Sequence, residues 1–201
     1  AFYDEDGAFD EDVAKEAYYD MMKAYHYPIP DYLKTEEFWT ADFMQGDFAQ
    51  LGMAGIFWKN VVGTYGEVGA GDYEGEFKDT DYGYLGHEIF LLPGQMIVEH
   101  SHVPAGDVAA KMESWQVRNG MIYTFAEGDE TVPCPVQTPA SQTDFITAKQ
   151  VKEVPIGEVD TLNRPEAMHF MLAGPQGAIV TEYATFHDND GLRFTNPNVK
   201  F

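Results

Sequence analysis

The sequence predicts an all-β sandwich or barrel that is preceded by a short helical arm. From about residue 40 onward, short apolar runs alternate with turn-forming Gly, Asn, Asp and Pro residues, which favours strands throughout over alternating strands and helices. With 201 residues, 44% of them hydrophobic, the chain can form one domain with a sizeable core and has little room for two. We therefore expect a single domain, with an arm at 1–40 packed on a barrel at 41–201.

The N-terminal arm opens with an acidic stretch that favours the start of a helix. Asp10 to Asp12 place negative charge where the helix dipole stabilises it. Apolar residues then recur at helical spacing and predict a helix at 11–25, which Pro28 and Pro30 end. We expect a second short helix at 30–38, and we expect this aromatic-rich arm to pack against the outside of the sheet.

The expected strands follow in order as short apolar runs. These runs lie at 53–59, 83–92, 96–102, 121–125, 144–147, 151–156, 168–172 and 178–186. Two polar segments rich in Gly or Pro, at 66–81 and 127–142, are expected to be loops. No internal repeat and no composition shift marks a second domain.

The charge and cysteine content exclude several classes of partner. The chain carries 12 Lys and Arg residues against 34 Asp and Glu residues, a net charge of −22, which argues against nucleic acid and anionic membranes as partners. Such a charge fits high solubility or a saline environment. The single cysteine, Cys134, excludes an internal disulfide and a cysteine-based zinc cluster. No membrane-spanning run or signal-peptide pattern is present, so we expect a cytoplasmic protein, with removal of a leader before Ala1 left open.

Two histidines and a glutamate form the strongest chemical signal in the sequence. His100 and His102 stand at positions i and i+2, which point to the same face of a strand. Glu113 can join them if the intervening loop turns the chain back. Two neutral imidazoles and a carboxylate make a transition-metal site that leaves room for water or substrate.

Glycines on either side place these residues in a known pattern. Five residues separate Gly94 from His100, and six separate Glu113 from Gly120. This arrangement resembles the first motif of the cupin superfamily, which implies a cupin double-stranded β-helix, a jelly-roll barrel. Ten residues separate His102 from Glu113, more than in the usual cupin. We expect the extra residues to form a small excursion over the mouth of the barrel.

Two ligand positions each have a rival. The second cupin motif would supply a histidine after a proline-containing turn, and His169 fits this pattern loosely, with His187 as the alternative. Glu99 is the alternative to Glu113, but it neighbours His100 and so points to the opposite face of the strand.

Two further segments resemble one family within the superfamily. Lys111-Met112-Glu113, after a His-x-His strand, is similar to the D-lyxose isomerase family, in which a lysine precedes Met-Glu. The stretch from Thr181 to Phe194 is similar to the ending of that family, with Thr181 in place of a glycine. The resemblance covers about 94–125 and 162–195.

The resemblance implies a set of site residues. The metal ligands would be His100, His102, Glu113 and His169. The family implies manganese as the divalent metal, with iron or zinc left open. Glu182 would be the catalytic base, because burial within its apolar run would raise the carboxyl pKa toward working pH; an outward-facing polar residue is the alternative. Lys111 would hydrogen-bond a substrate oxygen and offset developing negative charge, with a solvated lysine as the alternative.

Several other residues are candidates for the wall of a sugar pocket. Aromatic faces suit the C–H face of a sugar, although core packing is the alternative for each of Trp58, Trp115, Tyr123 and Phe125. Arg193 is a further candidate substrate contact, with a salt-bridged loop residue as the simpler interpretation. We expect His87 to be hydrogen-bonded in the core or the pocket wall, and His26 to be structural.

We therefore predict an aldose–ketose isomerase that acts on a free monosaccharide, of the D-lyxose/D-xylulose or D-mannose/D-fructose type that the resemblance implies. A phosphorylated sugar is disfavoured because basic residues are few and no Gly-rich phosphate loop is present. The alternatives are an iron-dependent cupin oxygenase, a metal-dependent lyase acting on a small acid, and a non-catalytic sugar-binding module. Because cupins often pair through their barrels, the resemblance also suggests a homodimer.

Overall fold

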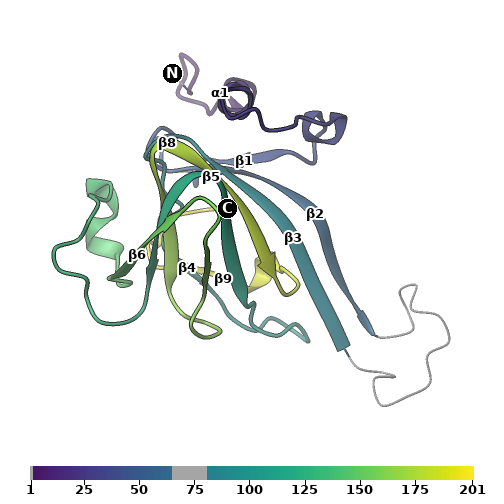
Figure 1. The fold of residues 1–201 in the computed structure, drawn as a ribbon, viewed down its shortest axis with the longest axis vertical. Helices are drawn as coiled ribbons and strands as arrows, with labels where there is room; N and C mark the ends of the chain where they lie inside the picture. Colours follow the sequence, from purple (N-terminus) through teal and green to yellow (C-terminus); the bar gives the residue numbers. More distant parts are fainter. Residues whose placement is uncertain (1, 65–80) are drawn as a thin grey trace.

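A computed structural model describes residues 2–64 and 81–201, whose regular secondary structure consists mainly of antiparallel strands (Figure 1). The strands are β1 (Trp39–Ala41), β2 (Met53–Thr64), β3 (Asp81–Leu91), β4 (His100–His102), β5 (Glu113–Ala126), β6 (Gln150–Pro155), β7 (Val159–Thr161), β8 (His169–Ala184) and β9 (Leu192–Phe194). The helices of the described residues are α1 (Glu11–Ala24) and three short 3-10 helices, η1 (Asp31–Lys34), η2 (Ala140–Phe145) and η3 (Asn189–Gly191). Nearly all of the polar loop expected at 66–81 lies outside the described residues.

The strands form one curled antiparallel sheet. Its order is β1-β2-β3-β8-β4-β9, and β5 pairs with β8 while also pairing with β6 and β7. Strand β8 is central, because it pairs with β3, β4 and β5. Figure 1 shows the strands curving around a common interior, with α1 outside it. This confirms the all-β class and the predicted barrel with an N-terminal helix.

A bend divides the long ladder between β5 and β8 into two halves. The register runs from Gly120 opposite Ala178 to Ile122 opposite Ala173, so β8 carries extra residues at this point. Gly120 has a φ of +71°, and a Cβ there would come within 2.0 Å of the Gly177 carbonyl oxygen. Only glycine fits both the left-handed backbone and this close approach. The ladder therefore changes direction between its two ends.

Helix α1 packs on the outer face of the sheet. Asp10 caps its first turn by accepting a hydrogen bond from the Val13 amide at 3.1 Å, and the helix ends at Ala24, one residue before the predicted end. Tyr18 lies at the centre of this contact and donates its hydroxyl to Gln95 at 2.6 Å. The outer cluster comprises Ala14, Tyr18, Met21, Met22, Leu33, Phe38, Phe48, Ala54, Ile56, Phe90, Leu92 and Ile179.

The second expected helix, at 30–38, forms only in part. The short helix η1 ends at Lys34, and Thr35 is already extended. Phe38 is buried in the outer cluster, whereas Trp39 opens β1 and lines an interior cavity. Consecutive side chains of an extended chain point to opposite sides, which is the arrangement of Phe38 and Trp39. A helix would not place two consecutive side chains on opposite sides.

The run at 144–147 was predicted as a strand and is not one. Helix η2 occupies its start, and the backbone amides of Thr147 and Ala148 donate to the Glu99 carboxylate at 2.9 and 2.7 Å. These amides therefore need no partner strand. The sequence also did not reveal β1, β7 and β9, each of which has three residues.

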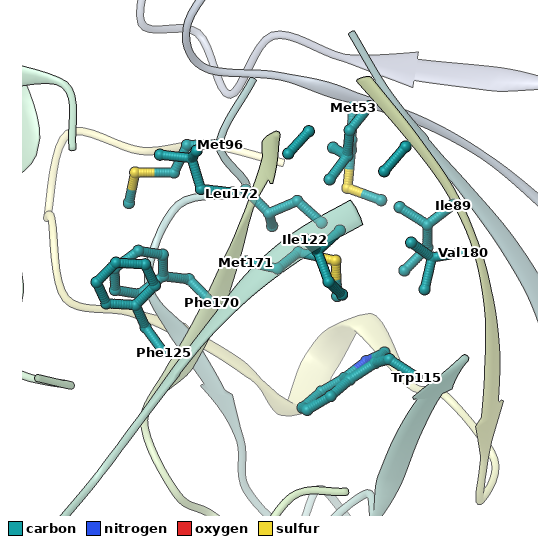
Figure 2. Packing of buried hydrophobic residues seen from close by; sticks show 14 of the residues in the cluster. Met53, Ile89, Met96, Trp115, Ile122, Phe125, Phe170, Met171, Leu172 and Val180 are labelled. Carbon is teal, nitrogen blue, oxygen red and sulfur yellow. The ribbon is translucent and has the colours of Figure 1, made fainter. Parts of the chain in front are cut away.

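An inner apolar cluster fills the interior of the barrel (Figure 2). It includes Met53, Ile89, Met96, Trp115, Ile122, Phe125, Phe170, Met171, Leu172 and Val180. Met53, Ile89, Trp115 and Met171 also line the interior cavity and so form its apolar wall. Among the described helices, none has the length and apolar character needed to cross a membrane.

Candidate active site

Three histidines from two strands meet inside the barrel. His100 and His102 stand at the two ends of β4, and His169 opens β8 directly opposite His100. Each offers one ring nitrogen, and these nitrogens all lie within 4.8 Å of one another. The Nδ1 atoms of His100 and His169 lie 2.9 Å from the carbonyl oxygens of Val98 and Ala167. A neutral ring that donates Nδ1–H to a carbonyl leaves Nε2 unprotonated and able to bind a metal.

Glu113 joins this cluster from the first position of β5. Its Oε2 atom lies 2.8 Å from His169 Nε2, and its Oε1 atom lies 3.3 Å from His102 Nε2. Glu113 Oε2 and His102 Nε2 are buried and make no hydrogen bond within the described part of the chain. Such unsatisfied polar atoms are costly in a folded protein, and a bound cation would satisfy them. Three imidazoles and one carboxylate are a donor set that fits a divalent transition metal.

The protonation states of the cluster are set by burial and by neighbouring charge. Burial lowers the pKa of His100 well below 6.5, and this keeps the ring in the neutral form that binds metal. Burial alone would raise the pKa of Glu113, but Lys111 and the neighbouring imidazoles hold it well below 4.5. Burial opposes charge on His169, yet Glu113 outweighs this effect and raises the pKa of that ring. Metal binding would therefore compete with a proton on His169.

The spacer between His102 and Glu113 folds into a small turn. Ala105 and Val108 exchange two backbone hydrogen bonds, of 3.0 and 2.9 Å, and form an isolated bridge. The amide of Val103 also donates to the Gly191 carbonyl at 2.9 Å. The long spacer is therefore an excursion that returns the chain to the histidines, so that Glu113 reaches them.

The ammonium group of Lys111 links Glu113 to a second carboxylate. Lys111 lies two residues before Glu113, ahead of β5, and only 5% of it is exposed. Its Nζ atom lies 2.5 Å from Glu113 Oε1 and also contacts Glu182 Oε1. Burial alone would lower the pKa of Lys111, but the two carboxylates outweigh it and raise the pKa. Lys111 is thus a charged group shared by two carboxylates and is not a solvated lysine.

Glu182 faces the interior near the end of β8. It is 3% exposed and pairs in register with His87 of β3 and Trp115 of β5. His87 Nδ1 lies 3.2 Å from Glu182 Oε2. The sequence-based expectation of a raised pKa is not met: burial does raise it, but Lys111 outweighs burial and the pKa of Glu182 is lowered. The carboxylate is therefore ionised at neutral pH.

These polar groups share one cavity with a wall of aromatic side chains. The cavity encloses about 590 Å³, including space that is open to solvent. Its polar residues are His87, His100, His102, Lys111, Glu113, His169, Glu182 and His187. Its aromatic residues are Trp39, Phe43, Phe57, Trp115, Phe170, Phe194 and Phe201. The structure thus brings every predicted metal ligand, Glu182, Lys111 and Trp115 to one place.

Three predicted substrate contacts do not line this cavity. Tyr123 and Phe125 lie in the second half of β5, beyond the bend at Gly120, and Phe125 stacks on Phe170 with ring centroids 4.2 Å apart. Arg193 donates to two backbone carbonyls at 2.9 and 2.6 Å. Its neighbours in β9, Leu192 and Phe194, both line the cavity, so strand alternation turns the Arg193 side chain away from it.

The two rival ligands lie outside the group of three histidines. Glu99 accepts hydrogen bonds from Thr147, Ala148 and Thr195, on the side of the chain away from His100. His187 lines the cavity, but its Nε2 atom lies 2.7 Å from Asn189 Oδ1. Burial lowers the pKa of His187 to about 4.

Sequence reasoning did not identify Trp39 and Phe57 as cavity residues. Trp39 was expected to close the second helix predicted at 30–38, and this expectation concealed the strand alternation that turns its side chain inward. Phe57 could have been identified from the sequence, because Met53, Gly55 and Phe57 stand at alternate positions of β2 and face the interior. Trp58, the next residue, packs against the outer cluster instead.

Comparison with known proteins identifies the family. The D-lyxose/D-mannose isomerase of Thermosediminibacter oceani is 31% identical to this chain over 140 residues, which span 67% of this chain and 76% of that protein. This chain belongs to the D-lyxose isomerase family. A second member, the D-lyxose ketol-isomerase of Cohnella laeviribosi, is 30% identical over 117 residues, or 58% of this chain and 64% of that protein. No family model matches the sequence.

Solved structures show that this member of the D-lyxose isomerase family shares its fold with L-ribose isomerases. The ligand-free L-ribose isomerase of Cellulomonas parahominis has a TM-score of 0.67 and 16% identity, and the match covers 93% of this chain and 91% of that one. The Acinetobacter sp. DL28 L-ribose isomerase in complex with L-ribose has a TM-score of 0.65 and 12% identity, with 94% and 92% covered. At these identities the likeness concerns the fold alone.

Proposed function

We propose that this protein is a metal-dependent isomerase that interconverts an aldose and a ketose of the D-lyxose/D-xylulose or D-mannose/D-fructose type. The observation that carries the proposal is the arrangement of Lys111 between Glu113 and Glu182, beside three histidines in an aromatic-lined cavity. The names of the relatives support the choice of substrate, because they are D-lyxose and D-mannose isomerases.

The histidine cluster is the proposed metal site. The residues that would hold the ion are His100, His102, Glu113 and His169. A divalent ion supplies Lewis acidity toward the carbonyl and hydroxyl oxygens of a sugar. The donor set agrees with manganese, as the resemblance implies, and also with iron or zinc.

Glu182 is the proposed base for the proton transfer between the two carbons that exchange the carbonyl. Its lowered pKa keeps it ionised, so it can take the proton from C2 of the aldose. The electron pair of that C–H bond forms the C1–C2 double bond while the carbonyl electron pair of C1 moves onto O1, which gives an enediolate. The proton of the O2 hydroxyl then passes to O1, the C2 carbonyl forms, and the electron pair of the double bond takes the proton back from Glu182 at C1. One carboxylate can serve both positions because they are adjacent carbons.

Lys111 is the proposed donor to the substrate oxygens. An ammonium group has three protons, and Glu113 and Glu182 engage two of them. The third remains for a sugar oxygen, where a fixed positive charge stabilises developing negative charge. In this arrangement the lysine also holds Glu182 beside the metal cluster.

The cavity favours a free sugar over a phosphorylated one. Among the residues that line it, Lys111 is the one lysine or arginine, and two carboxylates already surround it. A phosphate group would find no lysine or arginine there that is not already paired with carboxylates, and it would face Glu182 and Glu113.

The proposal is tested by assaying the metal-loaded protein with D-lyxose, D-mannose and D-xylulose in the absence of oxygen. Turnover of any of them supports the isomerase and argues against an oxygenase or a non-catalytic sugar-binding protein. Absence of turnover with every pentose and hexose tried, at full metal occupancy, would contradict the proposal.

A further inference from the structure

One buried side chain next to Glu182 has no place in the mechanism above. His87 lies in the middle of β3, directly across the ladder from Glu182 of β8. Its Nδ1 atom lies 3.2 Å from Glu182 Oε2, and the residue is 4% exposed. Lys111 contacts the other oxygen of the same carboxylate. Glu182 is therefore held at both oxygens, by groups from two different parts of the chain.

The contact defines which ring nitrogen of His87 carries a proton. An ionised carboxylate has no proton to donate, so His87 Nδ1 must be the donor to Glu182 Oε2. His87 Nε2 is buried and has no hydrogen-bond partner among residues 2–64 and 81–201. A buried nitrogen without a partner costs stability, and an apolar residue of similar size would avoid that cost. The hydrogen bond to Glu182 is thus the polar interaction that distinguishes histidine from a core-filling residue here.

The ring of His87 is fixed on all sides. It stacks on Trp39, with centroids 5.6 Å apart and planes at 30°, and the ring of Phe57 meets it at 4.6 Å and 74°. Gly55 leaves the space that the ring occupies, because a Cβ at Gly55 would lie 2.4 Å from His87 Nε2. The imidazole is therefore closely packed in the orientation that directs Nδ1 at Glu182.

We propose that His87 is a positioning residue that fixes the plane of the Glu182 carboxylate toward the substrate. The inference rests on the proposed function, in which Glu182 moves the proton. Lys111 cannot supply this constraint alone, because its third proton is directed to the substrate and a single contact leaves the carboxylate able to rotate. Among the described residues, the side chain of His87 makes no hydrogen bond to the four proposed metal ligands, and its one hydrogen-bond contact is with Glu182.

Two substitutions separate positioning from packing. His87→Leu fills much of the same space without a donor, whereas His87→Asn places an amide N–H near the position of Nδ1. We expect His87→Leu to lower kcat by roughly 10- to 100-fold with KM nearly unchanged, because the base is displaced while binding is retained. We expect His87→Asn to recover most of the loss, with the metal content of both variants equal to that of the wild-type protein.

Equal losses in the two variants, or full activity of a folded His87→Leu protein, would overturn the inference. A spectroscopic measurement gives an answer that does not depend on activity. In 15N-histidine-labelled protein loaded with diamagnetic zinc, the His87 ring should show a proton on Nδ1, and a neutral ring protonated at Nε2 would also overturn it. Failure of the proposed function has a different signature, since the wild-type protein itself would then turn over no sugar.

Discussion

Glu113 and His169 lie at opposite ends of the same ladder, yet their side chains are 2.8 Å apart. Glu113 begins β5 and pairs with Ala184, whereas His169 begins β8 and pairs with Ala126. Curling of the sheet, with the bend near Gly120, brings the two ends together. The site is therefore a direct consequence of closing the barrel, and a substitution that opens the bend would separate the ligands.

The first prediction concerns the fourth ligand. His169→Ala should lose most of the bound divalent metal, because it removes a ring nitrogen of the three-histidine cluster. His187→Ala should retain it, because His187 contacts Asn189 and stands outside that cluster. Metal content of the purified variants, measured by elemental analysis after loading with excess Mn²⁺ and desalting, distinguishes them. The reverse result would move the ligand to His187.

The second prediction concerns the base. Glu182→Gln keeps the shape of the side chain and one oxygen for Lys111, but the amide cannot accept a proton. We expect kcat to fall by about 10²- to 10⁴-fold while metal content stays unchanged. Glu88→Gln is a matched control, since Glu88 is also buried and lies on β3, where it bonds Tyr27 and Thr181 outside the cavity. An unchanged rate in Glu182→Gln would exclude Glu182 as the base.

The third prediction concerns the cation that Glu113 and Glu182 share. Lys111→Met leaves two buried carboxylates without their ammonium partner, and breaking a buried ion pair costs about 3–5 kcal/mol. For a domain of this size, each kcal/mol lowers Tm by about 2–4 °C. We therefore expect a large fall in Tm when the protein is scanned in EDTA, and a smaller fall with metal, whose charge compensates Glu113.

Lys152→Met is the control for this comparison. Lys152 pairs with Asp160 at 2.7 Å, but its side chain is 59% exposed, and such surface pairs contribute little. Equal shifts of Tm in the Lys111 and Lys152 variants would show that the buried network does not stabilise the metal-free protein.

Local patterns in the sequence were enough to predict one half of the site. His100 and His102 follow from strand alternation, and the resemblance to the cupin motif, which the bounding glycines carry, placed Glu113 with them despite the long spacer. Lys111 and Glu182 entered through resemblance to a family, since no local pattern predicts that both side chains reach one another. The choice of His169 over His187 depends on the pairing of β8 with β4, which spacing alone does not define.

The remaining cavity residues depend on tertiary register. His87 meets Glu182 because β3 and β8 pair in one particular register, and a slip of one residue would turn His87 to the outer face. Trp39 lines the cavity because the chain before it is extended, whereas the sequence predicted a helix there. Arg193 was predicted as a substrate contact but does not line the cavity. Its strand, β9, was too short to be recognised in the sequence, so the outward direction of the side chain could not be derived.

The last prediction concerns the net charge of −22, which the site does not explain. Repulsion among 34 acidic residues, opposed by 12 basic ones, destabilises the compact state, and added salt screens it. Raising KCl from about 0.1 M to about 1 M shortens the screening length from about 10 Å to about 3 Å. We expect Tm in EDTA to rise by several degrees over this range, because relief of about 1 kcal/mol is worth about 2–4 °C. NaCl at equal concentration should raise Tm by the same amount, since the effect depends on ionic strength. A flat or falling Tm in both salts would show that the surface charges are spaced too far apart to repel one another appreciably.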